Sequence, residues 1–156
     1  MSILFAESGS DATQGLEFYA TSTGTVASST TYAKTGPRSI KFDSTAGDIL
    51  AAIYAAITQK AAGRADLWVY FDDLPSTATL TFISAKLITT TIVQVDVTTG
   101  GVIQLRASSG SQLGSDGSTI QADKWYRFCL TWNITNTTTF TIKLYLNGSL
   151  DITANS

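Results

Sequence analysis

The feature that most constrains the fold is an alternation of apolar and polar residues in the segment KWYRFCLTWNITNTTTFTIKLYLNGSL (residues 124–150). Two apolar runs with a period of two make it up: Tyr126, Phe128, Leu130, Trp132 and Ile134, then Phe140, Ile142, Leu144 and Leu146. Successive side chains of a β-strand point to opposite faces, so each run predicts a strand with one apolar face. NITNTT between the runs predicts the turn of a hairpin, and Asn147-Gly148 predicts a second, shorter turn.

The same period recurs upstream, so we predict an all-β protein. RADLWVYFDDLP (residues 64–75) predicts a strand that ends before Pro75, and TIVQVDVTTGGVIQLRAS (residues 91–108) predicts a hairpin that turns at Thr99-Gly100-Gly101. About ten strands of ordinary length, separated by turns, indicate a two-sheet antiparallel sandwich. The chain has 156 residues, 44% of them hydrophobic and only 14% charged, which suits one folded domain over residues 1–156.

One segment, GDILAAIYAAITQKAAG (residues 47–63), leaves helix and strand both open. Asp48 is a candidate helix cap and Gly63 a candidate helix end. The alanine content favours a helix by propensity alone. The apolar residues from Ile49 to Ile57 are equally consistent with a buried strand, so the secondary structure of residues 48–62 stays undecided at this stage.

Charge and composition exclude several classes of function. The net charge is −2 and the ten Lys and Arg residues are scattered, which gives neither a nucleic-acid footprint nor attraction to anionic membranes. No apolar run approaches the length of a transmembrane helix, and the start MSILFAESGSD lacks the basic region of a signal peptide. The single cysteine, Cys129, forms no internal disulfide and has no histidine to activate it, so we expect a packed or half-packed side chain.

The order of five motifs resembles the concanavalin A-like, laminin G-like jelly-roll superfamily. These motifs are TGPRSIKF (35–42), RADLWVYFDDLP (64–75), VDVTTGGVIQLR (95–106), ADKWYRFCLTW (122–132) and FTIKLYLNG (140–148). The resemblance implies a jelly-roll sandwich in which the place of Ile49–Ile57 is a strand, with at most one short helix. Such domains usually continue beyond the Asn-Gly turn with at least one more strand. Here either SLDIT (residues 149–153) closes a short variant of the sandwich or a sheet edge stays open, and an open edge favours assembly with another chain.

No catalytic constellation stands out. The glycan-cleaving members that the chain resembles use two acidic residues facing one cleft, whereas Asp72 and Asp73 are neighbours at a predicted strand end and read as a solvated turn. The absence of histidine excludes Ser–His–Asp catalysis and a His-ligated metal. We therefore expect no enzyme, no catalytic residue and no cofactor. Calcium, which needs only oxygen ligands, is the one alternative; Asp11, Asp43, Asp48 and Asp116 are its candidates, but none has loop-motif spacing.

Four aromatic residues are the candidate contacts for a ligand or partner: Trp68, Tyr70, Trp125 and Tyr145. Each lies opposite the apolar face of its predicted strand. Exposed aromatic rings can stack on the apolar face of a sugar. The alternative is that a loop, the residues from Ile49 to Ile57, or another subunit covers them. The other strand aromatics are expected in the core.

We expect a non-catalytic structural or adhesive protein, a phage-type virion component such as a capsid decoration or tail-associated subunit. Three features support this expectation: the strands are Thr-rich and low in charge, export and disulfide signals are absent, and a sheet edge can stay open. The expected partners are protein chains, in a homo-oligomer or on a particle at the virion or extracellular surface, with neither nucleic acid nor membrane insertion. The alternative is a carbohydrate-binding, lectin-like module whose partners are glycans.

Overall fold

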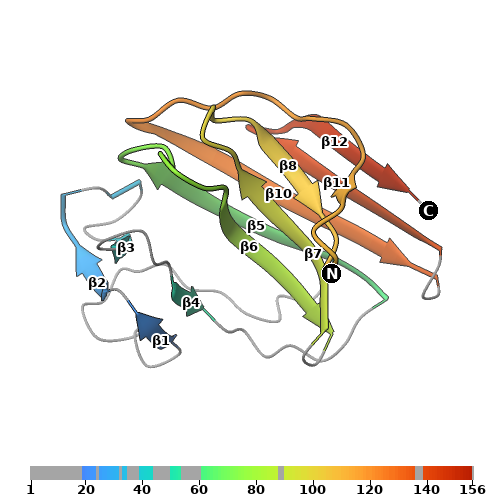
Figure 1. The fold of residues 1–156 in the computed structure, drawn as a ribbon, viewed down its shortest axis with the longest axis horizontal. Helices are drawn as coiled ribbons and strands as arrows, with labels where there is room; N and C mark the ends of the chain where they lie inside the picture. Colours follow the sequence, from blue (N-terminus) through green and yellow to red (C-terminus); the bar gives the residue numbers. More distant parts are fainter. Residues whose placement is uncertain are drawn as a thin grey trace. The chain divides into compact units, whose positions relative to one another are not determined.

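The computed structural model describes residues 19–23, 25–31, 33–34, 39–43, 50–53, 61–87, 90–135 and 139–155, and Figure 1 shows its strands. The chain divides into two compact units, residues 1–58 and 59–156, and each is described by itself. The single domain over residues 1–156 stays a prediction.

The first unit contributes two antiparallel strand pairs. β1 (Tyr19–Thr23) pairs with β4 (Leu50–Ile53), and β2 (Thr25–Ser29) pairs with β3 (Ser39–Asp43). β4 lies inside the segment that left helix and strand open, and it is a strand. Pairing with β1 outweighs the helix propensity of its alanines, because tertiary context overrides a preference of a few tenths of a kcal/mol per residue. Residues 54–60, where a short helical turn was an option, lie outside the described residues.

The second unit holds two four-stranded sheets in which every pairing is antiparallel. The β10 sheet has the order β12 (Ser149–Asn155), β11 (Phe140–Leu146), β10 (Lys124–Ile134), β5 (Ala62–Phe71). The β7 sheet has the order β6 (Leu80–Leu87), β7 (Thr90–Val97), β8 (Ile103–Arg106), β9 (Gln112–Leu113). Figure 1 shows β6, β7 and β8 stacked on β5, β10 and β11. In the described residues, no helix is long and apolar enough to cross a membrane.

The core lies between these two sheets and follows the predicted alternation. The β10 sheet supplies Phe71, Phe128, Leu130, Ile142, Leu144 and Ile152, and the β7 sheet supplies Val93, Val95, Val97, Ile103 and Leu105, all at most 5% exposed. Phe82 of β6 joins the two sets, because its ring lies 5.4 Å from that of Phe71 and 4.8 Å from that of Phe128. Edge-to-face contacts of this kind add to the burial energy of the rings. The predicted fold class, an all-β two-sheet antiparallel sandwich, is confirmed.

Glycine is required at two turns and at one close contact between neighbouring strands of the sheets. Asn147 and Gly148 both have positive φ (51° and 91°) and join β11 to β12 as predicted. Gly101 ends the turn between β7 and β8 with φ of 77°, where a Cβ would lie 2.5 Å from the carbonyl oxygen of Ile120. Gly63 of β5 lies under the ring of Trp132, which leaves no room for a Cβ. Trp132 is half-buried and packs against the core cluster, as expected.

Candidate functional site

The β10 sheet has a second face, turned away from the core, which we call the outer face. It carries alternate residues of three strands: Arg64, Asp66, Trp68 and Tyr70 of β5, Trp125, Arg127, Cys129, Thr131 and Asn133 of β10, and Thr141, Lys143 and Tyr145 of β11. All four aromatic residues singled out from the sequence therefore share one face. The strand register then decides which of them meet.

Tyr70 and Trp125 form a ring pair at one end of this face. They are register partners on β5 and β10, with ring centroids 5.4 Å apart and planes tilted by 51°. The hydroxyl of Tyr70 donates a hydrogen bond of 3.1 Å to Oδ1 of Asp123, so the pair is anchored on one side. Both rings are half-buried. Because each covers the other, neither offers a whole ring face to a ligand.

Trp68 is the most exposed of the four aromatic residues. It lies two positions from Tyr70 on β5, opposite Arg127 of β10, and 44% of its surface is exposed. An indole of this exposure leaves a large apolar area in water, since most tryptophans are well buried. Trp68 therefore presents more of its side chain to solvent than the other three aromatic residues do.

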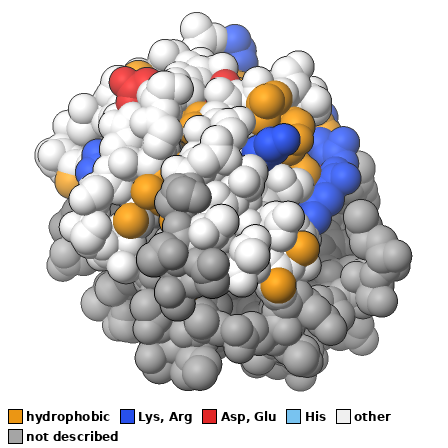
Figure 2. All heavy atoms as spheres, turned by 90° about the vertical axis from the view of Figure 1, so that its right-hand side faces the viewer, with side chains coloured by type: hydrophobic (Ala, Val, Ile, Leu, Met, Phe, Trp, Pro, Cys, Tyr) orange, Lys and Arg blue, Asp and Glu red, His pale blue; other side chains and the backbone are white. Residues whose placement is uncertain are grey.

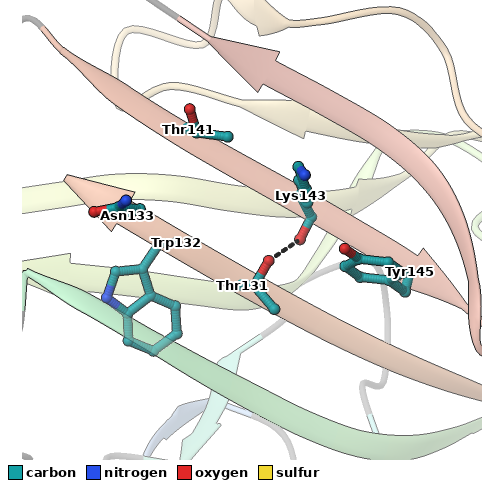
Figure 3. A pocket seen from close by; sticks show the side chains of 6 residues that line it. All are labelled: Thr131, Trp132, Asn133, Thr141, Lys143 and Tyr145. Carbon is teal, nitrogen blue, oxygen red and sulfur yellow. Dashed lines mark hydrogen bonds between the residues drawn. The ribbon is translucent and has the colours of Figure 1, made fainter.

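Tyr145 lies away from the other three aromatic residues, on β11, and lines two neighbouring hollows. The first has a volume of about 370 Å³ and is lined by Thr131, Trp132, Asn133, Thr141, Lys143 and Tyr145 (Figure 3). The second has about 270 Å³ and is lined by Arg64, Arg127, Cys129, Thr131, Tyr145 and Gly148. Thr131 and Tyr145 belong to both, so the hollows adjoin across β5, β10 and β11. We call them together the outer groove.

Charged side chains surround one carboxylate beside the second hollow. Arg127 donates from Nε and Nη2 to the two oxygens of Asp66, at 2.8 and 2.6 Å, in a forked pair. Arg64 also donates to Asp66. The Asp66 side chain is 28% exposed, and the side chains of Arg64 and Arg127 are 43% and 42% exposed. Two guanidinium groups thus share one carboxylate at the surface.

This arrangement shifts the pKa values of Asp66, Arg127 and Cys129. The hydrogen bonds from Arg127 hold the pKa of Asp66 below its usual range, against the opposing effect of partial burial. Asp66 in turn raises the pKa of Arg127. Desolvation raises the pKa of Cys129, whose thiol is free and 8% exposed, so it is a packed side chain as expected. Asp66 is therefore ionised and Cys129 is a thiol at neutral pH.

Sequence reasoning missed the charged residues of the outer face. Arg64, Asp66 and Arg127 have the same parity as the aromatic residues of their strands, so alternation alone assigns them to that face. The Lys and Arg residues were read only as scattered along the sequence, because the pairing of β5 with β10 joins residues 61 positions apart. Only this pairing brings them together.

The carboxylates considered for catalysis or calcium do not converge in the described residues. Asp72 and Asp73 are exposed in the turn after β5, where Asp73 accepts a 2.8 Å hydrogen bond from the amide of Leu74. Asp116 accepts hydrogen bonds from Gln104 and Gln112 at 2.7 and 2.9 Å. Asp11 and Asp48 and the side chain of Asp43 lie outside the described residues. Across the described ranges, no three His, Cys, Asp or Glu residues form a metal-binding group.

Two four-stranded antiparallel sheets packed on a shared core define the described part of residues 59–156 as a two-sheet β-sandwich. The model of the concanavalin A-like lectin/glucanases superfamily, in its laminin G-like form, matches residues 46–156. The chain belongs to this superfamily, which confirms the resemblance noted in its sequence motifs. Neither a curated protein nor a solved structure matches the chain.

Proposed function

We propose that the protein is a non-catalytic glycan-binding module that uses the outer face of its β10 sheet. One observation carries the proposal: Trp68 is 44% exposed on a sheet face that also holds Tyr145 and the outer groove. Membership in a superfamily of lectins and glucanases is compatible with this function but does not select it, since one fold hosts many functions.

The chemistry of the face suits a sugar. A pyranose ring has one apolar face, which an indole can cover at little desolvation cost, and a rim of hydroxyl groups that need hydrogen-bond partners. Trp68 supplies the apolar surface. Thr131, Asn133 and Thr141 line the first hollow and supply hydroxyl and amide groups within the same sheet (Figure 3). Apolar surface with a few placed polar groups is the usual composition of a small-molecule site.

The absence of catalysis is part of the proposal. Glycoside hydrolysis needs two carboxyl groups about 5–10 Å apart across the scissile bond. Among the described side chains that line or flank the groove, Asp66 is the one carboxylate. It accepts hydrogen bonds from Arg127. A carboxylate with a lowered pKa is unsuited to the role of general acid. Hydrolysis of a bound glycan would contradict this part.

Replacing Trp68 tests the proposed function. The protein is assayed on a panel of neutral and acidic oligosaccharides, and the best ligand is titrated against wild type, Trp68→Ala and Trp68→Phe. We expect Trp68→Ala to weaken binding at least about tenfold, or about 1.4 kcal/mol, and Trp68→Phe to retain most of it. Thermal unfolding of each variant is the control, because an exposed side chain contributes little to stability. Silence across the whole panel would refute the proposal.

A second candidate is a structural or adhesive subunit of a phage-type virion, and one observation favours it. Leu150 is 54% exposed on β12, the strand at one edge of the β10 sheet among the described strands. An exposed edge with an apolar residue is a template for pairing with another chain. This function predicts a closed oligomer or a particle-bound species in native mass measurements, which Leu150→Lys disrupts. A monomer at high concentration that attaches to no particle would exclude it.

A further inference from the structure

We propose that the outer groove recognises an acidic saccharide, through carboxylate groups that bind Arg64, Arg127 and Lys143. This inference rests on the proposed glycan-binding function and specifies its ligand class. It starts from the charge balance of the groove. Three cationic side chains line the two hollows, and one carboxylate, Asp66, offsets them within the described residues.

This local excess of positive charge stands out because the whole chain carries a net charge of −2. Figure 2, which views the molecule from one side, shows several basic side chains beside hydrophobic ones and an acidic patch apart from them. An acidic chain repels long polyanions, so a nucleic acid is a poor ligand. A saccharide that carries single carboxylates between neutral hydroxyl groups suits a few cations within a polar groove.

The arginine geometry already shows carboxylate binding. Arg127 holds Asp66 through Nε and Nη2, and a guanidinium has further N–H donors beyond these two. Arg64 shares the same carboxylate, so the two guanidinium groups are brought to one place and lie beside the second hollow. A ligand carboxylate placed there meets two cations and competes with Asp66 for their N–H donors.

The groove extends from this pair toward Lys143. Thr131 is the register partner of both Arg64 on β5 and Lys143 on β11, so these three residues form one row across the sheet. Neighbouring strands lie about 4.8 Å apart, which places the backbones that carry the two cations about 10 Å from each other. The hydroxyl of Thr131 donates to the carbonyl of Lys143 (Figure 3), and Tyr145 lies beside both hollows. The row therefore offers cations on both sides of a polar centre.

The test compares each acidic ligand with its uncharged methyl ester. Oligosaccharides of galacturonate, glucuronate and sialic acid are titrated beside the methyl ester of each. We expect the best free acid to bind at least about tenfold more tightly than its ester, and 1 M salt to remove most of this difference. Arg64→Gln and Lys143→Gln each weaken binding of the acid about fivefold and weaken binding of the ester much less. Lys124→Gln removes the same charge from an exposed site outside both hollows and is the matched control.

The substitution Asp66→Asn is expected to change affinity for the acid in the opposite direction. It removes the carboxylate that competes for the two guanidinium groups, so affinity for the acid rises about fivefold while the ester is unaffected. Equal binding of acid and ester would overturn the inference and leave the glycan-binding function standing. An equal effect of Lys124→Gln would show general charge attraction and overturn it too. If no acidic or neutral glycan binds, the proposed function itself fails.

Discussion

Each sheet of the sandwich carries a cluster of aspartate and arginine, and the two clusters differ in burial and in charge balance. On the β7 sheet, Asp96 is 4% exposed, accepts a 2.7 Å hydrogen bond from the hydroxyl of Thr81 and lies 3.2 Å from Nε of Arg106. That arginine is also held by Gln104 and the carbonyl of Gly110. On the β10 sheet, Asp66 is shared by Arg64 and Arg127 in solvent.

The buried Asp96–Arg106 pair supports the fold, whereas the exposed Asp66 cluster belongs to the proposed binding site. The Asp96 pair balances one charge with one, and burial makes any loss of a partner severe. The Asp66 cluster has one cation more than it has anions, and water screens its interactions, so it adds little to stability. Excess charge at an exposed place is where the proposed ligand binds.

Removing Asp96 has the largest expected effect on stability. Asp96→Ala leaves Arg106 half-desolvated without its carboxylate, so we expect a loss of about 2–3 kcal/mol in the free energy of unfolding. Urea denaturation measures it. Thr81→Val removes only the hydrogen bond and is expected to lose about 1 kcal/mol. If Asp96→Ala were as mild as Thr81→Val, the charge of Asp96 would not support the fold.

Removing Asp66 has a much smaller effect. We expect Asp66→Asn to change Tm by less than about 3 °C, because its partners are more than one third exposed. Differential scanning calorimetry in low and high salt measures the change, and salt reduces it further. A Tm loss that matched that of Asp96→Ala would show that the Asp66 cluster is structural and would remove the contrast.

The small contribution of Asp66 depends on pH with a defined sign. Its pKa is lowered in the folded protein, chiefly by Arg127, from an unfolded value of about 3.9. The stabilisation is therefore present above about pH 4 and is lost as the pH falls through the folded pKa. We expect the Tm difference between wild type and Asp66→Asn to vanish in strong acid. A difference that grew as the pH fell would contradict the assigned pKa shift.

The smallest effect concerns Cys129, which lines the second hollow opposite Asp66. Its raised pKa leaves little thiolate at pH 8, and it is 8% exposed, so alkylation by iodoacetamide is slower than in the urea-unfolded chain. A bound acidic saccharide slows it a further few-fold by covering the hollow. Mass spectrometry of the intact chain follows the reaction. An unchanged rate at saturating ligand would place the ligand outside the second hollow.

The period of two predicted most of the second unit from local information. Phe128, Leu130, Ile142 and Leu144 are core residues because each strand has one apolar face, and that property needs no knowledge of the partner strand. The Asn147-Gly148 turn was equally local, since few other pairs accept positive φ at both positions. The strand at Leu50–Ile53 was not, because its pairing with β1 decides it.

The candidate site was predictable only in part, for a reason of register. Trp68, Tyr70, Trp125 and Tyr145 were correctly assigned to the face opposite the core. Their grouping depends on which strands are neighbours, and the structure pairs Tyr70 with Trp125 while it leaves Tyr145 apart. The meeting of Arg64, Asp66 and Arg127 depends on the same unknown. The odd or even position of a residue in its strand predicts the sheet face that it occupies, whereas the residues that meet on that face depend on which strands pair.

The turn between β11 and β12 has a consequence for how binding can evolve. Asn147 accepts a hydrogen bond from the amide of Arg127 and donates its own amide to the Arg127 carbonyl, at 3.0 and 2.9 Å. The backbone that carries this guanidinium is thus clamped by a two-residue turn 20 positions away in the chain. In the proposed binding site, a substitution or insertion in that turn displaces Arg127 without altering any residue that lines the first hollow. The ligand preference of the proposed site then depends partly on a hairpin turn outside that hollow.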